Sequence, residues 1–150
     1  MTPTLTLLDK PDPAVVRAVH ALLLAFNNNA SGYAFDGQAL VISVTDHDRS
    51  EGGGEGKSEI VGGLWGSTSY GYLHIDMLIV PESLRGTGLG TRMMQQAEDE
   101  AIRRGCHGSY LDTFDFQARG FYERLGYTVF GQLEDTPPGH TRYFLKKSLV

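Results

Sequence analysis

Apolar residues recur along the chain at two spacings, one typical of helices and the other of strands. Near the N-terminus, the segment "AVVRAVHALLLAF" repeats apolar residues at helical intervals. Asp12 and Pro13 stand directly before it, and these residue types favour the cap and the first turn of a helix. We therefore expect an amphipathic helix over 12–30 that packs on another element. The preceding "TLTLLD" at 4–9 has the composition of a strand.

Residues 39–80 carry strand patterns. "ALVISVTD" at 39–46 predicts one strand, and "IVGGLWGSTSYGYLHIDMLIV" at 60–80 predicts two more around a Ser-Thr-Ser-Tyr-Gly turn. Between them, 47–59 has no period and four glycines, which is typical of a mobile surface connection. The three strands together predict an antiparallel meander.

Helix and strand patterns then alternate toward the C-terminus. The apolar side of the first helix is formed by Leu89, Met93, Met94, Ala97 and Ala101. Gly105 suits the end of this helix. "GSYLDTF" at 108–114 predicts a strand, and "DFQARGFYERLGY" predicts a helix with Asp115 at its N-cap and Gly126 at its end. "TVFGQLED" and "TRYFLKKSLV" predict two final strands.

This order of elements predicts a mixed α/β fold in one domain over residues 1–150. Strand, helix and strand in the middle of the chain imply one right-handed parallel crossover within a mainly antiparallel sheet. We expect a sheet of about six or seven strands, flanked by helices. No internal repeat or linker divides the 150 residues, and this length suits one hydrophobic core.

Composition and charge narrow the classes of function. A net charge of −5 and the thin spread of Lys and Arg argue against nucleic-acid binding. No apolar run approaches the length of a membrane span, and no signal-peptide pattern opens the chain. The single cysteine, Cys106, cannot form an internal disulfide, which fits a reducing compartment. We therefore expect a cytoplasmic protein with no membrane or nucleic-acid partner.

The segment "RGTGLG" at 85–90 places three glycines directly before a helix pattern. The first turn of a helix offers unpaired N–H groups and the positive end of its dipole, and glycine lets a phosphate approach that backbone. Arg85 adds a positive charge, so the pattern predicts a diphosphate site. It lacks the Gly-Lys-Ser/Thr ending of a nucleotide-triphosphatase loop and the spacing of a dinucleotide-binding loop. The alternative is that the glycines only pack the helix tightly against the sheet.

Two motifs in the chain resemble those of the GNAT superfamily of N-acetyltransferases. "RGTGLG" matches that family's Arg/Gln-x-x-Gly-x-Gly/Ala signature, and "LIVPESL" before it resembles the strand and link that lead into it. "ARGFYERLGY" at 118–127 resembles the second signature, a helix with a tyrosine before a Leu-Gly-aromatic turn. The resemblance is detailed from Leu73 to Tyr127, and the N-terminal third is a loose match. It implies acetyl-CoA as co-substrate. We expect no metal, because no His/Cys cluster shows metal-ligand spacing.

The resemblance also implies where acetyl-CoA binds. Beside Arg85, its pyrophosphate would lie on the backbone of Gly86, Thr87, Gly88, Leu89, Gly90 and Thr91. Its pantetheine arm would pair, like an extra strand, with the main chain of Leu78, Ile79 and Val80. In the family, a bulge opens the slot beside this strand. Asp115 stands where family members commonly have an asparagine that touches the coenzyme. An ionised aspartate cannot donate a hydrogen bond, so capping the helix is the alternative.

Acetyl transfer to an amine needs a base for the amine and an acid for the departing thiolate. Tyr122 falls on the family's tyrosine position, so the resemblance makes it the candidate acid, with a core tyrosine as the alternative. Asp76 and His74 share one face of the strand "LHIDMLIV", and aspartate is unusual in a half-buried strand. These two residues are the candidate base. Asp112 offers a third carboxylate, and ordered water is the alternative to any dedicated base.

The sequence thus predicts an acetyl-CoA-dependent N-acetyltransferase that moves an acetyl group to a primary amine of a small molecule or peptide. We expect direct attack in a ternary complex, because no His/Asn arrangement supports a covalent route through Cys106. The alternative is a catalytically silent acetyl-CoA-binding or regulatory domain. The sequence leaves open the acceptor, and also whether the chain forms the homodimer that is common in the family.

Overall fold

The chain folds as two compact units, Met1–Phe35 and Asp36–Val150. The computed structural model describes residues 3–46 and 59–150. The glycine-rich connection expected at 47–59 lies outside the described residues, except for Glu59. The expectation of one domain over 1–150 stays a prediction.

The N-terminal unit contains the helix α1 (Pro13–Ser31), as the apolar periodicity predicts. The Asp12 carboxylate caps it by accepting the Ala14 N–H at 2.8 Å, and Gly32 follows in the left-handed region at φ 73°. The strand expected at 4–9 is wrong, since no described residue before Gln38 belongs to a strand. A segment of strand-like composition becomes a strand only where a neighbour pairs with its backbone, and 4–9 has no place in the strand order.

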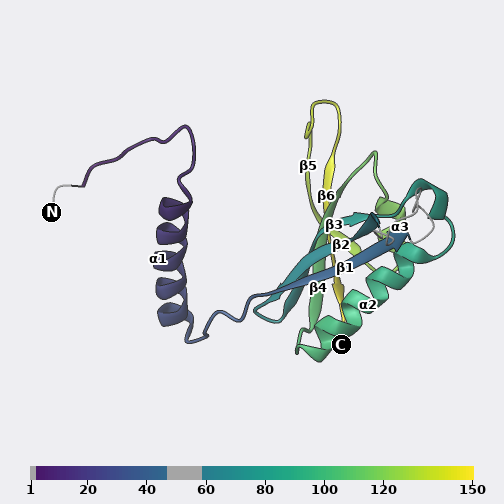
Figure 1. The fold of residues 1–150 in the computed structure, drawn as a ribbon, viewed down its shortest axis with the longest axis horizontal. Coiled ribbons are helices and arrows are strands. Elements are labelled where there is room, and N and C mark those ends of the chain that lie inside the picture. The colour runs from purple at the N-terminus through teal and green to yellow at the C-terminus, as the bar shows by residue number, and fades with distance from the viewer. Residues whose placement is uncertain (1–2, 47–58) are drawn as a thin grey trace, which may run out of the picture. The chain divides into compact units, whose positions relative to one another are not determined.

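The second unit is built on a mixed sheet of six strands, drawn as arrows in Figure 1. The strands are β1 (Gln38–Asp46), β2 (Glu59–Ser69), β3 (Tyr72–Ile79), β4 (Gly108–Phe114), β5 (Thr128–Leu133) and β6 (Arg142–Ser148). Their order across the sheet is β1-β2-β3-β4-β6-β5. β1, β2 and β3 form the expected antiparallel meander, and β3 pairs with β4 in parallel. The mixed α/β fold with a central crossover is confirmed.

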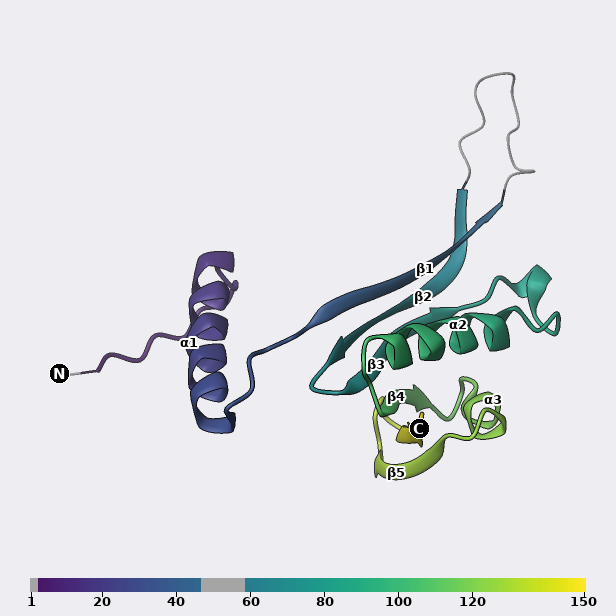
Figure 2. The same ribbon diagram turned by 90° about the horizontal axis from the view of Figure 1, so that it is seen from below.

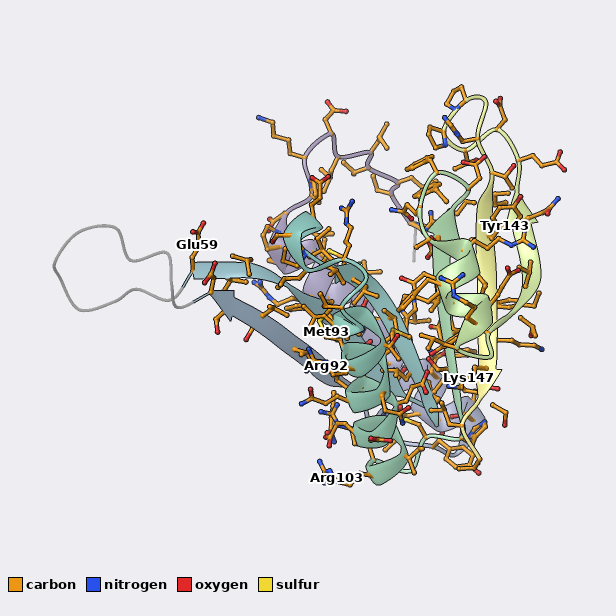
Figure 3. All side chains as sticks on the ribbon, turned by 90° about the vertical axis from the view of Figure 1, so that its right-hand side faces the viewer. Glu59, Arg92, Met93, Arg103, Tyr143 and Lys147 are labelled. Carbon is orange, nitrogen blue, oxygen red and sulfur yellow. The ribbon has the colours of Figure 1, made fainter. Side chains whose placement is uncertain are left out.

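The helix α2 (Leu89–Arg103) connects β3 to β4 and lies along one face of the sheet, as Figure 2 shows. Figure 3 labels two neighbours with opposite surroundings: Met93 is buried, whereas Arg92 is exposed. The buried side of the helix consists of Gly90, Met93, Met94, Ala97, Glu98 and Ala101. These side chains form the core with sheet residues such as Leu73, Ile75 and Leu111. The amphipathic helix predicted from Leu89 onward is therefore confirmed.

β3 and β4 pair over only part of their lengths. Their parallel register runs from Tyr72 opposite Gly108 to Ile75 opposite Leu111, although both strands continue beyond those residues. At the same point, the register between β2 and β3 shifts, because Trp65 faces Met77 while Gly66 faces Ile75. Asp76 is the extra residue of this bulge, and a bulge bends its strand away from a neighbour. The two strands therefore separate from Asp76 onward.

The helix α3 (Arg119–Arg124) is shorter than the pattern predicts, and Ala118 rather than Asp115 is its N-cap. The Asp115 N–H donates to Thr141 O at 2.9 Å, and its carboxylate accepts the Thr141 N–H at 3.0 Å. Asp115 therefore ties the end of β4 to the start of β6 instead of capping a helix. Asp115 therefore lies outside the helix that carries Tyr122. The turn after the helix is as expected, with Gly126 at φ 92°.

Candidate functional site

A groove of about 870 Å³ opens where β3 and β4 separate. One side is formed by β3 from Asp76 onward and by the first turn of α2, and the other by the end of β4 and by α3. The sequence-predicted residues that line it are Asp76, Leu78, Ile79, Val80, Arg85, Gly86, Gly88, Leu89, Gly90, Thr91 and Tyr122. The fold thus brings one candidate base, the candidate acid and most of the predicted phosphate loop to a single groove.

The three glycines of the loop are required for different structural reasons: two for their backbone conformation and one for close packing. Gly86 and Gly88 have φ of 77° and 80°, a conformation that side chains disfavour, and Gly88 is the N-cap of α2. A Cβ on Gly90 would lie 3.2 Å from Phe121 Cζ and 3.3 Å from Val80 Cγ2. Gly90 therefore allows α2 to pack closely on its neighbours, as the packing alternative holds. Gly86 and Gly88 turn the chain into α2, whose first residues, Leu89 to Thr91, line the groove.

Three predicted site residues do not line the groove. The Thr87 hydroxyl donates to Leu84 O at 2.7 Å, which closes the turn before α2. The Asp115 carboxylate is 2.9 Å from His140 Nδ1. Burial raises the pKa of Asp115, but its bonds to Thr141 and His140 outweigh burial and hold that pKa below its usual value. The third residue, His74, lies beside Asp76 on β3.

The inner end of the groove carries a short polar and aromatic cluster. His74 Nδ1 lies 3.3 Å from Asp76 Oδ1, and the His74 ring stacks on Tyr110 with 4.4 Å between centroids. Burial raises the pKa of Tyr110, and the Asp76 charge raises it further. Because Asp76 also lines the groove, its carboxylate connects the groove to this cluster. Asp112, the third carboxylate considered, is instead bound by Arg142 Nε at 2.7 Å.

Tyr122 is buried in the wall of the groove, with 8% of its surface exposed. Its hydroxyl makes no hydrogen bond to any residue the structure describes, yet no described buried polar side-chain atom lacks a partner. The hydroxyl is therefore accessible, and because Tyr122 lines the groove we infer that it opens there. Burial, with a smaller contribution from the charge of Asp112, raises the pKa of Tyr122 to about 12. The tyrosine stays protonated at neutral pH and can donate a proton.

Several lining residues were not predicted. They are Met77, Leu84, Thr113, Phe116, Gln117, Ala118, Phe121 and Arg124. Phe121 and Arg124 flank the predicted Tyr122, so the motif at 118–127 held a usable signal for them. Gln117 and Phe116 lie in the turn between β4 and α3, where no periodicity marks a contact.

The groove suits a long ligand with a charged end and an amide-rich arm. At one end, the N–H groups of the first turn of α2 have no partner within the helix, and Arg85 and Arg124 stand nearby. Beyond them, the edge of β3 from Asp76 onward is not paired with β4. An extended chain can therefore add to β3 like a strand. Phosphates, an amide-containing arm and a reactive end near Tyr122 match the chemistry of acetyl-CoA.

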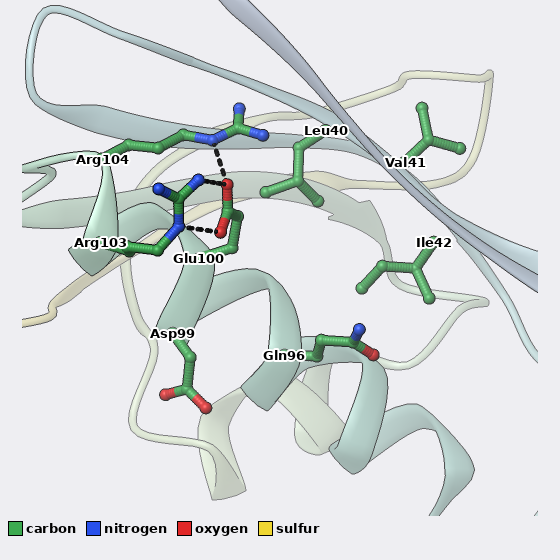
Figure 4. A pocket seen from close by; sticks show the side chains of 8 residues that line it. All are labelled: Leu40, Val41, Ile42, Gln96, Asp99, Glu100, Arg103 and Arg104. Carbon is green, nitrogen blue, oxygen red and sulfur yellow. Dashed lines mark hydrogen bonds and ion pairs between the residues drawn. The ribbon is translucent and has the colours of Figure 1, made fainter.

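A second hollow of about 480 Å³ lies between α2 and β1, as Figure 4 shows. Three of its charged residues pair with one another, because Glu100 accepts from Arg104 Nε at 2.7 Å and from Arg103 Nη2 at 2.6 Å. These two bonds, Arg103 first, lower the pKa of Glu100 to about 2. Arg104 also donates to Ala39 O at 3.1 Å. These bonds connect the end of α2 to β1.

The model of the acetyltransferase (GNAT) family matches residues 24–127 of this chain. The chain belongs to the GNAT acetyltransferase family, and the resemblance inferred from the two motifs is confirmed. It is an acyltransferase-family protein built around the groove between β3 and β4.

Two curated relatives carry the same class of name. A blasticidin-S acetyltransferase from Streptomyces morookaense is 45% identical over 94 residues, which cover 62% of this chain and 69% of that protein. Acetyltransferase Atu2258 from Agrobacterium fabrum is 35% identical over 139 residues, covering 93% and 94% of the two chains.

Solved structures share the fold. A crystal structure from Agrobacterium tumefaciens has a TM-score of 0.84 at 34% identity, covering 97% of this chain and 99% of that one. An aminoglycoside 6′-N-acetyltransferase complexed with coenzyme A has a TM-score of 0.61 at 20% identity and covers 95% of both chains. In residues 3–46 and 59–150, none of the helices has the length and apolar character needed to span a membrane.

Proposed function

We propose that this protein is an N-acetyltransferase that transfers the acetyl group of acetyl-CoA to a primary amine by direct attack in a ternary complex. One observation carries the proposal: the first turn of α2, Asp76 and Tyr122 all line a single groove. A site that only stored the coenzyme would need the first of these and neither of the others.

The first turn of α2 and Arg85 would hold the phosphates, and Arg124 adds a second positive charge to the same groove. The exposed edge of β3 at Leu78, Ile79 and Val80 would pair with the pantetheine arm. The bound coenzyme supplies an acetyl thioester, whose carbonyl carbon an amine attacks. Because the phosphate end is fixed at α2, the thioester is directed toward the end of the groove where Asp76 and Tyr122 lie.

Asp76 and His74 would prepare the acceptor. An alkylamine has a pKa near ~10.4 and is mostly protonated at neutral pH, so it must lose a proton before it attacks. The Asp76 carboxylate attracts the ammonium form, and with His74 Nδ1 at 3.3 Å the pair can accept the proton directly or through water. The stacked ring of Tyr110 holds His74 in place.

Tyr122 would complete the transfer. As the bond between the acetyl carbon and sulfur breaks, the leaving thiolate needs a proton, and the Tyr122 hydroxyl can donate one from the groove wall. The resulting tyrosinate is the stronger base, because the pKa of Tyr122 is about 12 and that of a thiol is near ~8.5. Proton transfer from Tyr122 to a free thiolate is therefore uphill by itself. It is offset where it is coupled to cleavage of the carbon–sulfur bond, and the proton released from the amine then restores Tyr122.

The test is release of free thiol from acetyl-CoA with a panel of amines. Blasticidin S belongs in the panel, because a relative of 45% identity is named for that acceptor. We expect at least one amine to give product carrying an acetyl group on nitrogen, detected by mass spectrometry. Coenzyme binding with no thiol release across the panel would favour the alternative, a silent acetyl-CoA-binding domain. A product acetylated on oxygen would support an acyltransferase but contradict the proposal that the acceptor is an amine.

A further inference from the structure

We propose that Gln117 binds the pantetheine arm by donating a hydrogen bond from its Nε2 group. The inference rests on the proposed function, since it concerns how the same groove holds its coenzyme. Gln117 lies in the turn between β4 and α3, is exposed, and lines the groove. No motif in the sequence points to it.

The orientation of the Gln117 amide is fixed by two donors. The Phe114 N–H donates to Gln117 Oε1 at 2.9 Å, and the Thr113 hydroxyl donates to the same oxygen at 3.1 Å. An amide nitrogen accepts no hydrogen bond, so a flipped side chain would leave the Phe114 N–H without its acceptor. The nitrogen end of Gln117 must therefore point away from β4.

The position of this bond matters as much as its direction. The N–H groups of successive strand residues point to opposite neighbours, and the Asp115 N–H donates to Thr141 next to β6. The Phe114 N–H therefore points to the other side, where β3 would lie had the two strands not separated. Gln117 Oε1 takes the place of the missing strand as acceptor. The Gln117 side chain therefore lies between β4 and a ligand bound in the groove.

The Nε2 group has two N–H donors, and neither donates to an acceptor in the described residues. The pantetheine arm contains amide carbonyls, which are suitable acceptors for a strand-like ligand between β3 and β4. Asp115 cannot serve instead, because its carboxylate has no donor and is held by Thr141 and His140. Gln117 Nε2 is the side-chain amide donor that this turn offers to the arm.

Gln117→Glu tests the inference, because it keeps an oxygen for Phe114 and Thr113 and removes the donor. Calorimetry should compare two probes: coenzyme A, which has the arm, and adenosine 3′,5′-bisphosphate, which lacks it. We expect coenzyme A to bind about 5- to 20-fold more weakly to the variant, with little change for the nucleotide. Gln96→Glu, which makes the same charge change in the hollow between α2 and β1, should alter neither affinity.

Thermal unfolding separates a binding role from a structural one. Gln117→Glu should keep the wild-type Tm, whereas Gln117→Leu, which also loses the bonds to Phe114 and Thr113, should lower it. Unchanged coenzyme A affinity in Gln117→Glu overturns the inference and leaves the proposed function intact. Equal weakening for both probes also overturns it, because charge would then be the cause. A wild type that binds neither probe overturns the proposed function itself.

Discussion

Tyr122 and Tyr127 stand next to each other, with ring centroids 6.1 Å apart, and both are buried. The Tyr127 hydroxyl donates to Glu98 Oε1 at 3.0 Å and lies 2.8 Å from Ser109 Oγ. Lys147 Nζ completes this network by donating to Glu98 Oε2 at 2.6 Å. The Tyr122 hydroxyl has no such partner and opens into the groove. The tyrosine behind the groove is thus held in a hydrogen-bond network, whereas the hydroxyl of the tyrosine in its wall is left available for a substrate.

Tyr122→Phe should have the largest effect of the four variants on the rate. Removing the proposed acid should lower kcat by about 10²- to 10³-fold. The affinity for coenzyme A and the Tm should change little, because the hydroxyl bonds to no described residue. Steady-state kinetics with any accepted amine, together with calorimetry, measure these quantities. An unchanged kcat removes Tyr122 from the mechanism.

Gly88→Asp should sharpen the assignment of the groove. A carboxylate at the N-cap of α2 would repel phosphates from the first turn, and the side chain would also strain a backbone at φ 80°. We expect the affinity for coenzyme A to fall by about 30- to 100-fold. Gly139→Asp is the matched control, because Gly139 has φ 83° and equally open surroundings but lies outside the groove. Similar losses in both variants would point to misfolding rather than lost phosphate binding.

Tyr127→Phe should have the opposite profile to Tyr122→Phe. It removes the hydroxyl that pairs with buried Glu98 and Ser109, so the free energy of unfolding should fall by about 1–3 kcal/mol. Urea unfolding measures the loss, and kcat at a temperature where the variant is folded should stay near the wild-type value. A large fall in kcat with unchanged stability would show that the network serves the reaction.

The smallest expected effect is a difference in alkaline stability. The pKa of Tyr122 is raised to about 12 in the folded chain, so its stabilising effect is complete below the unfolded pKa near ~10 and declines as pH rises toward 12. Relative to Tyr122→Phe, the wild type should lose on the order of 1 kcal/mol of unfolding free energy between pH 8 and pH 11. Urea unfolding of both proteins at several pH values measures this. A constant difference would mean that Tyr122 titrates normally.

The elements that carry strong periodicity were predictable from the sequence. α1, α2 and the strands from β1 to β6 follow from their apolar spacing, and the glycine loop indicated the end of the groove that we propose for the phosphates. The prediction of a strand at 4–9 was wrong because strand-like composition does not show whether a second strand is present to pair with it. The prediction of Asp115 as an N-cap was wrong because aspartate is equally suited to capping a helix and to bonding a neighbouring loop. Its bonds to Thr141 and His140 show the second role.

The inner end of the site depends on features that composition does not encode. The bulge at Asp76 arises from a register shift against Trp65 and Gly66 on another strand. The sequence placed His74 and Asp76 on one face by alternation, which the 3.3 Å contact supports, although a bulge interrupts that alternation. Gln117 gained its position from a hydrogen bond to Phe114, and no pattern along the chain marks such a bond.

Because β3 and β4 pair over only four residues of each strand, the two halves of the sheet can rotate slightly against each other. One half of the sheet consists of β1, β2 and β3, and the other of β4, β6 and β5. Backbone pairing joins the two halves only from Tyr72 to Ile75 of β3. Where β3 and β4 are unpaired, from Asp76 onward, a small rotation of one half against the other breaks no backbone hydrogen bond between them. A ligand laid along the gap resists that rotation and, because it binds only the folded chain, adds to its stability as its concentration rises. Bound in that gap as we propose, acetyl-CoA would act as a further strand between β3 and β4 and would make the sheet stiffer while it is bound.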